Sequence, residues 1–243
     1  MAVVSKRALC YTVRNLSEGA EISMKFDITD NVVVRALSKI CDMVCLNIMW
    51  LVCCIPIVTI GASTTALYTV MLKMVKNEEG YIFRGFFKSF KMNFKQGTIS
   101  WLILLALWIV WFVDYRVSGI MAGTTGLVMR VIFLAVGFIL LSVTIYVFPL
   151  IARYENTIGA TLKNALILSV ARLPYTFLMV LVIVAAVIAS LWSTVTLAFA
   201  LPLWLLIGGA LIAWINSYIL RRVFRVLEEN SSTDDNHADG NSA

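Results

Sequence analysis

Charged residues are scarce in this sequence and unevenly distributed. Only 14% of the 243 residues are charged, whereas 60% are hydrophobic. A soluble domain usually has about a quarter of its residues charged, so this composition argues against a water-soluble globular fold. A bilayer core accommodates about 20 apolar residues per helix. Spans are therefore predicted within four stretches that lack any charged residue: Met43–Leu72, Gln96–Val113, Val131–Ala152 and Leu173–Leu220.

Residues that could hold a metal or perform catalysis are equally scarce. The one histidine, His237, lies in a polar tail, and no Walker loop, His-rich metal motif or Gly-x-Ser-x-Gly elbow occurs. A zinc site needs about four converging ligands, and the cysteines gather instead in or beside the first apolar stretch, where we interpret them as packing residues. We therefore expect no enzyme activity, no cofactor and no metal. The five cysteines are Cys10, Cys41, Cys45, Cys53 and Cys54.

Away from their ends, the predicted spans contain no Asp, Glu, Lys or Arg. Ionisable residues at membrane depth usually mark proton relays and ion paths, so their absence argues against an ion-coupled pump. The neutral polar residues of the spans are interpreted as hydrogen-bonding groups between helices. A binding site for a neutral, hydroxyl-rich ligand such as a sugar is the alternative. These residues are Asn47, Thr59, Ser63, Thr64, Thr65, Tyr68, Ser142, Thr144, Tyr146, Asn216 and Ser217.

The number of spans depends on Pro56. Apolar segments precede and follow it, at 31–55 and 57–75, and a proline either kinks a helix or ends it. Basic residues favour cytoplasmic loops. With two spans here, and counting from Met24, 15 Lys and Arg lie inside and 2 outside, against 12 and 5 with one span. The fold class is therefore predicted as an all-α, polytopic transmembrane bundle of five or six spans, with six favoured.

The remaining order along the chain follows from the same patterns. Further spans are predicted at Thr98–Val113, Val131–Ala152, Tyr175–Trp192 and Phe199–Leu220, with an external segment at 114–130 and a cytoplasmic one at 153–172. Both chain ends are predicted in the cytoplasm of a multi-pass bacterial cell membrane protein. The basic residues lie in short segments between spans, so nucleic acid is not expected as a partner. Three regions result: an N-terminal extension at 1–23 that could precede a start at Met24, a membrane domain at 24–226, and a disordered acidic tail at 227–243.

Residues 81–95 form the clearest amphipathic segment. Ile82, Phe86, Phe90 and Phe94 recur every four residues, and a basic face lies away from this stripe. Such a helix lies flat in the lipid headgroup region. It is interpreted as an interfacial elbow helix, and a role in lipid sensing or partner binding is the alternative. Its basic residues, the first three of which are candidate partner contacts, are Arg84, Lys88, Lys91 and Lys95.

A second candidate contact lies in the segment 153–174. Glu155, Gly159 and the pair Leu173-Pro174 have a spacing that looks like a degenerate coupling loop of ABC importer permeases. That loop begins with Glu-Ala-Ala, contains Gly and ends in Leu-Pro. Here Asn156 and Thr157 replace the alanines, and the glycine comes two positions early. A proline that simply marks the start of a span is the alternative.

The stretch Asn47–Gln96 closely resembles the signature of the YesL-like family of bacterial integral membrane proteins, a domain of unknown function. The resemblance covers roughly residues 24–226 and implies several membrane spans. It also implies frequent association with sugar ABC importers, but no established activity. The matching positions are Asn47 and Trp50, Pro56, Ile57, Thr59, Ile60 and Gly61, Ala66–Tyr68, and the aromatic repeat Phe86, Phe87, Phe90 and Phe94.

These patterns predict an accessory or regulatory membrane component linked to carbohydrate uptake. Its expected partners are the lipid bilayer and the permease or ATPase subunits of an ABC importer. The alternative is a transporter or permease subunit for a small neutral solute such as a sugar.

Overall fold

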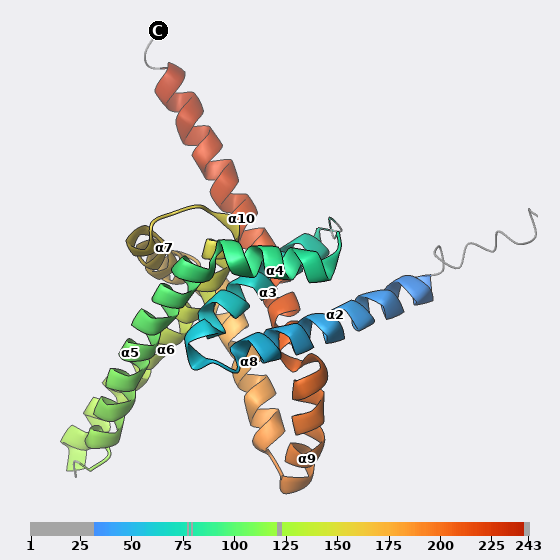
Figure 1. Ribbon diagram of the computed structural model, residues 1–243. Coiled ribbons are helices and arrows are strands. Elements are labelled where there is room, and N and C mark those ends of the chain that lie inside the picture. The colour runs from blue at the N-terminus through green and yellow to red at the C-terminus, as the bar shows by residue number, and fades with distance from the viewer. Residues whose placement is uncertain (1–31, 77, 79, 121–122, 241–243) are drawn as a thin grey trace, which may run out of the picture. The chain divides into compact units, whose positions relative to one another are not determined.

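The computed structural model describes the backbone of residues 32–76, 78, 80–120 and 123–240 and, within these ranges, the side chains of residues 37–225. The described residues form helices and no strand (Figure 1). Six helical segments are long and apolar enough to cross a membrane, which confirms the all-α, multi-span prediction. The helices are α2 (Val32–Cys54), α3 (Ile60–Val75), α4 (Ile82–Met92), α5 (Phe94–Ser118), α6 (Gly123–Arg153), α7 (Ile158–Ala171), α8 (Leu173–Leu191), α9 (Thr194–Leu203) and α10 (Gly209–Gly240).

Helix α3 is the most buried of the six apolar segments. The chain divides into two compact units, residues 1–42 and 43–243, and α3 lies in the second. It packs against α4, α5, α6 and α10, and Ala66, Leu67 and Met71 are at most 2% exposed. Contact with α5 requires Gly61, because a Cβ atom there would overlap the carbonyl oxygen of Gly97. Small residues thus let two backbones approach closely, as is common between membrane helices.

Pro56 separates two helices rather than kinking one. Helix α2 ends at Cys54, a short 3₁₀ turn follows at Ile57–Thr59, and α3 begins at Ile60. The Thr59 hydroxyl lies 2.6 Å from the carbonyl oxygen of Cys53 and 2.8 Å from that of Pro56, and it donates to them. It thereby supplies a donor to the Cys53 carbonyl, which the end of α2 leaves without an intrahelical partner. At this proline the structure therefore contains two separate helices and not one long kinked helix.

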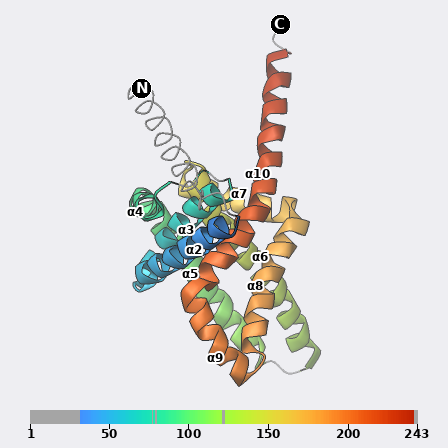
Figure 2. The ribbon, with the colours of Figure 1, turned by 90° about the vertical axis from the view of Figure 1, so that its right-hand side faces the viewer.

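The turn at Pro56 lies near the start of α5. The indole Nε1 of Trp101 donates a 2.9 Å hydrogen bond to the carbonyl of Ile57. Ser118, the last residue of α5, lies about 25 Å further along this helix at a rise of 1.5 Å per residue. In both views the turn ends well short of the tips of the α5–α6 and α8–α9 pairs (Figures 1 and 2).

The α5–α6 and α8–α9 connections are short. Helix α5 continues to Ser118 and α6 begins at Gly123, whose φ of 79° suits glycine. The segment predicted as external, 114–130, is therefore largely helical, because both helices continue beyond the uncharged cores of the predicted spans. The connection predicted near Ser193 is confirmed. Ser193 and Thr196 form a capping box there. The Thr196 hydroxyl accepts a bond from the Ser193 amide, and the Ser193 hydroxyl accepts one from the Val195 amide.

Helix α7 occupies most of the segment predicted only as a cytoplasmic stretch. It begins after Thr157, whose hydroxyl accepts a bond from the Ala160 amide, and it buries Thr161, Ala165 and Leu168. Spacings of four and three residues place these side chains on one helix face. With 14 residues, α7 is shorter than the roughly 20 residues that cross a bilayer core.

The two chain ends differ from the prediction or lie outside the described residues. Helix α10 continues to Gly240, where the composition predicted a disordered tail at 227–243. Helix extension adds one hydrogen bond per residue once a helix is nucleated, and α10 is nucleated by its packing against α3 and α8. The predicted extension at 1–23 lies outside the described residues.

We expect the turn at Pro56 to lie within the bilayer rather than at the outer surface. In a cysteine-free background, a membrane-impermeant maleimide applied to intact cells should label Ile120→Cys but not Ile55→Cys. Both positions are exposed in the structure, at 84% and 78%, so only lipid would shield Ile55. Equal labelling of the two cysteines from outside would instead show six crossings.

Candidate functional site

The residues of the Asn47–Gly61 signature meet at the corner between α2 and α3. The Asn47 side chain is fully buried and reaches the junction of α9 and α10. Its Nδ2 donates to the carbonyls of Leu205 at 2.8 Å and Trp204 at 3.2 Å. Its Oδ1 accepts a 2.9 Å bond from the amide of Ala210. One amide side chain therefore satisfies three backbone groups of another segment.

That junction is an interrupted helix. Pro202 lies inside α9, a π-helical turn follows at Trp204–Gly208, and α10 begins at Gly209. Proline and π turns disturb the regular ladder of backbone hydrogen bonds. In a bilayer core, backbone groups freed in this way need partners from the protein. Asn47 supplies such partners directly after the proline.

Trp50 packs on the same junction. Its indole Nε1 donates a 3.2 Å bond to the Thr64 hydroxyl, and the Ser63 hydroxyl donates a 3.0 Å bond to its carbonyl. Its ring lies so close to Gly209 that a Cβ atom there would come within 2.6 Å of it. The indole therefore joins α2, α3 and α10.

The signature thus forms a structural junction. Asn47 and Thr64 are occupied by hydrogen bonds to neighbouring helices. Among the described residues, no group of three His, Cys, Asp or Glu side chains is placed to hold a metal. The cysteines are predicted to be packing residues. Cys53 does pack against the core, whereas Cys45 is exposed, so the interpretation describes Cys53 but not Cys45.

Other buried polar groups lie where α3 faces α10. Asn216 and Ser217 are fully buried, and their side-chain polar atoms have no hydrogen-bond partner among the described residues. The Tyr68 hydroxyl of α3 lies beside Asn216, without a hydrogen bond of good geometry. These groups are neutral, as the span composition predicts.

Helix α4 is held against the bundle by one face. Phe86 is fully buried, and the Ser89 hydroxyl donates a 2.7 Å bond to the Thr69 hydroxyl of α3. The helix and its aromatic face are as predicted, although it ends at Met92 and Phe94 begins α5. The basic residues Arg84, Lys88 and Lys91 are all exposed.

The second candidate contact is joined to the start of α5, the helix that follows α4. Gln96, two residues after the start of α5, donates a 2.8 Å bond from Nε2 to the carbonyl of Asn156 and a 3.3 Å bond to the Thr161 hydroxyl. It thereby joins α5 to the connection between α6 and α7 and to the first turn of α7. Glu155 and Gly159 are exposed here. Sequence reasoning missed Gln96, because nothing in the local sequence around this glutamine indicates a partner 60 residues away.

Pro174 serves the local structure. It occupies the first turn of α8, where its missing amide hydrogen leaves no intrahelical bond unmade. It is exposed.

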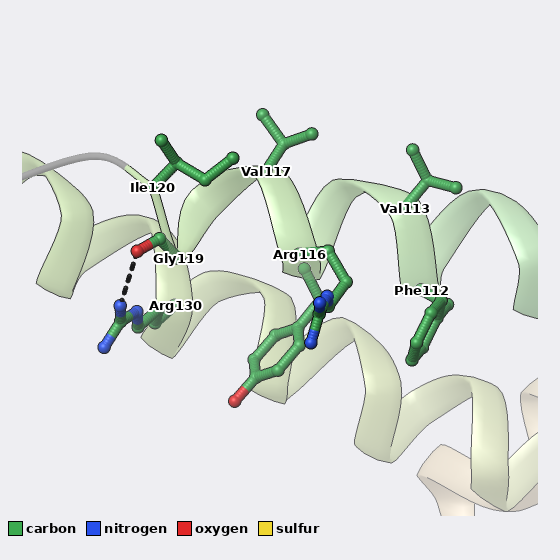
Figure 3. A pocket seen from close by; sticks show the side chains of 8 residues that line it. Phe112, Val113, Arg116, Val117, Gly119, Ile120 and Arg130 are labelled. Carbon is green, nitrogen blue, oxygen red and sulfur yellow. Dashed lines mark hydrogen bonds between the residues drawn. The ribbon is translucent and has the colours of Figure 1, made fainter.

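An open pocket of about 530 Å³ lies at the opposite end of α5 and α6. Figure 3 shows two arginines on its rim, of which Arg130 donates a 2.9 Å bond to the carbonyl of Gly119. Arg130 thereby closes the α5–α6 connection. The pocket walls are otherwise mostly apolar, and none of its lining residues is among the site residues predicted from the sequence.

The fold defines a class of protein: a polytopic α-helical protein with six helices suited to a membrane and a signature that joins its helices. Residues 43–115 match the family described as "Protein of unknown function, DUF624". The chain is 24% identical to the uncharacterized protein YesL of Bacillus subtilis (strain 168) over 210 residues, which cover 83% of this chain and 96% of YesL. These matches confirm the resemblance to the YesL-like family, whose function is not known.

A second relative is the uncharacterized protein YteU of the same organism. It is 26% identical over 146 residues, which cover 57% of this chain and 64% of YteU. No solved structure matches the chain. The family match covers α3, α4 and most of α5, and it therefore includes both sides of the Gly61–Gly97 contact.

Replacing Asn47 with alanine should destabilise the fold by about 1–3 kcal/mol, because three buried backbone groups lose their partner. The measurement is thermal or denaturant unfolding of the purified protein in detergent. Asn164→Ala is the matched control, since Asn164 is exposed on α7 and its loss should change stability by less than about 0.5 kcal/mol. Equal effects of the two variants would contradict the structural role of Asn47.

Replacing Gly61 with alanine should force α3 away from α5 and cost about 1–3 kcal/mol. The same change at Gly159 should be neutral or slightly stabilising, because nothing lies within 4 Å of a Cβ atom there and alanine favours helix. Unfolding midpoints measured side by side in one detergent would test this contrast. A Gly61→Ala protein as stable as the parent would rule out the close approach.

Proposed function

We propose that this protein is a non-catalytic membrane component that accompanies or regulates carbohydrate uptake by contacting a permease or ATPase subunit of an ABC importer. The proposed contact surface has two parts. One is the basic face of α4 (Arg84, Lys88 and Lys91), and the other is the segment 154–161, which comprises the α6–α7 connection with Glu155 and the first turn of α7. The observation that supports the proposal is the pair of bonds from Gln96, which join the start of α5 to the segment 154–161. Helix α4 ends two residues before α5 begins, so its C-terminal end and this segment lie at the same end of α5.

The charges of this surface suit a protein contact. Arg84, Lys88, Lys91 and Glu155 are all exposed, so a partner can reach them without rearranging the core. Charged groups at the rim of an interface mainly govern partner choice and association rate. The scarcity of acid–base groups elsewhere supports contact rather than catalysis. We propose the bacterial cell membrane as the location, with this surface and the C-terminus on the cytoplasmic side.

The test is affinity purification of the tagged protein from its native membranes in mild detergent, with mass spectrometry of the co-purified chains. An importer permease or its ATPase should co-purify with the parent protein. Recovery of that subunit should fall by about tenfold with Lys91→Glu or Glu155→Lys, the change that about 1.4 kcal/mol produces. Lys91→Arg and Glu155→Asp, which keep the charges, should retain it. Recovery of the subunit that ignores these charges would contradict the proposed surface.

A transporter for a small neutral solute is the second candidate. It is favoured by the meeting of two interrupted apolar segments, α2–α3 and α9–α10, at Asn47. Transporter sites often lie where interrupted helices meet at membrane depth. If the purified protein alone, reconstituted in liposomes, takes up labelled sugar, this function replaces the first.

A further inference from the structure

A cleft of about 350 Å³ lies between the end of α3 and the start of α4. Lys73 from the last turn of α3 and Arg84 and Lys88 from α4 line it. One carboxylate, Glu78, also lines it. The two lysines and the arginine come from different helices, so the packing of α4 on α3 is what brings three cations to one cleft.

These cations are available to a ligand. All three are exposed, and Lys73 and Lys88 form no ion pair with any side chain that the structure describes. Arg84 lies over the ring of Tyr81, with 5.6 Å from its guanidinium carbon to the ring centroid. Its planar guanidinium can donate two parallel hydrogen bonds to an anion, and the lysines add point charges.

The cleft lies at the depth where lipid headgroups are expected. Lys73 ends a segment that is apolar enough to enter a bilayer. Along α4, Phe83 and Phe87 are 65% and 41% exposed, and their ring centroids lie 4.9 Å apart. Exposed aromatic rings on an amphipathic helix insert at the boundary between headgroups and acyl chains. A phosphate at this level belongs to a phospholipid.

We propose that this cleft binds the phosphate headgroup of an anionic phospholipid, with Lys73, Arg84 and Lys88 as its ligands. Basic pockets between helices on the cytoplasmic side of a membrane suit such headgroups. The apolar cleft walls Val70 and Ile82 fit the start of an acyl chain better than a freely soluble phosphate. The cleft shares Arg84 and Lys88 with the proposed importer contact. The two proposals are tested separately, because the importer test changes Lys91 and Glu155, neither of which lines the cleft.

The experiment measures the unfolding temperature of the full chain in a neutral detergent. Phosphatidylglycerol is added at increasing mole fraction, with phosphatidylcholine and inorganic phosphate as separate arms. A ligand that binds only the folded state raises this temperature, so phosphatidylglycerol should raise it and the other two should not. In Lys73→Gln/Lys88→Gln, the apparent affinity should fall about fivefold for each charge removed. Lys91→Gln, which removes a charge from the same helix outside the cleft, should bind as the parent does.

A second pair of variants distinguishes a loss of lipid binding from a change in folding. A Cβ atom at Gly85 meets only Val70, at 3.9 Å, so Gly85→Glu places a carboxylate at the cleft without a clash, and Gly85→Gln is its neutral control. Loss of the phosphatidylglycerol response in Gly85→Glu alone would support the site. A response that is equal in Lys73→Gln/Lys88→Gln and Lys91→Gln overturns it, as does an equal response to phosphatidylcholine. A response to inorganic phosphate alone would assign the cleft to a soluble anion.

Discussion

The side chain of Asn47 connects the two interrupted segments of this protein. It bonds to the backbone on both sides of the π-helical turn between α9 and α10, while Trp50 of the same helix packs on Gly209. The irregular helix can exist in an apolar environment because backbone groups near Pro202 gain partners from Asn47. The corner at Pro56 is positioned by the same contacts. A polar residue in the first apolar stretch therefore organises the last one.

Around this junction the helices divide into a packed part and more exposed pairs. Helix α3 is the centre of the packed part, since α4, α5, α6 and α10 all contact it. The close approach at Gly61 and Gly97 places α4 and the start of α5 beside α3. Through Gln96, the same geometry reaches the connection between α6 and α7. The proposed contact surface and the lipid cleft both follow from how α4 is held on α3.

Much of the secondary structure could be predicted because its causes are local. Uncharged stretches predicted the long helices, Pro56 predicted a break, and the aromatic repeat predicted α4. The segment 153–172 was harder, because α7 mixes basic and apolar residues and is too short to be recognised as a span. The charge distribution favoured two spans around Pro56. It cannot distinguish two crossings from a pair that returns to the same side, because both arrangements place the same basic residues in the cytoplasm.

The sequence by itself determined that this is a multi-span α-helical protein that resembles the YesL-like family, since hydrophobic length and a motif of consecutive residues are properties of the chain. It also supplied the residues of the signature, but not what they contact. Asn47 and Leu205 are 158 residues apart, and no local pattern in either segment identifies the other. Only the tertiary structure decided that the signature joins helices, that Gln96 joins the start of α5 to the α6–α7 connection and that Lys73 lies beside α4. These relations depend on packing between distant segments, which single-chain periodicity does not encode.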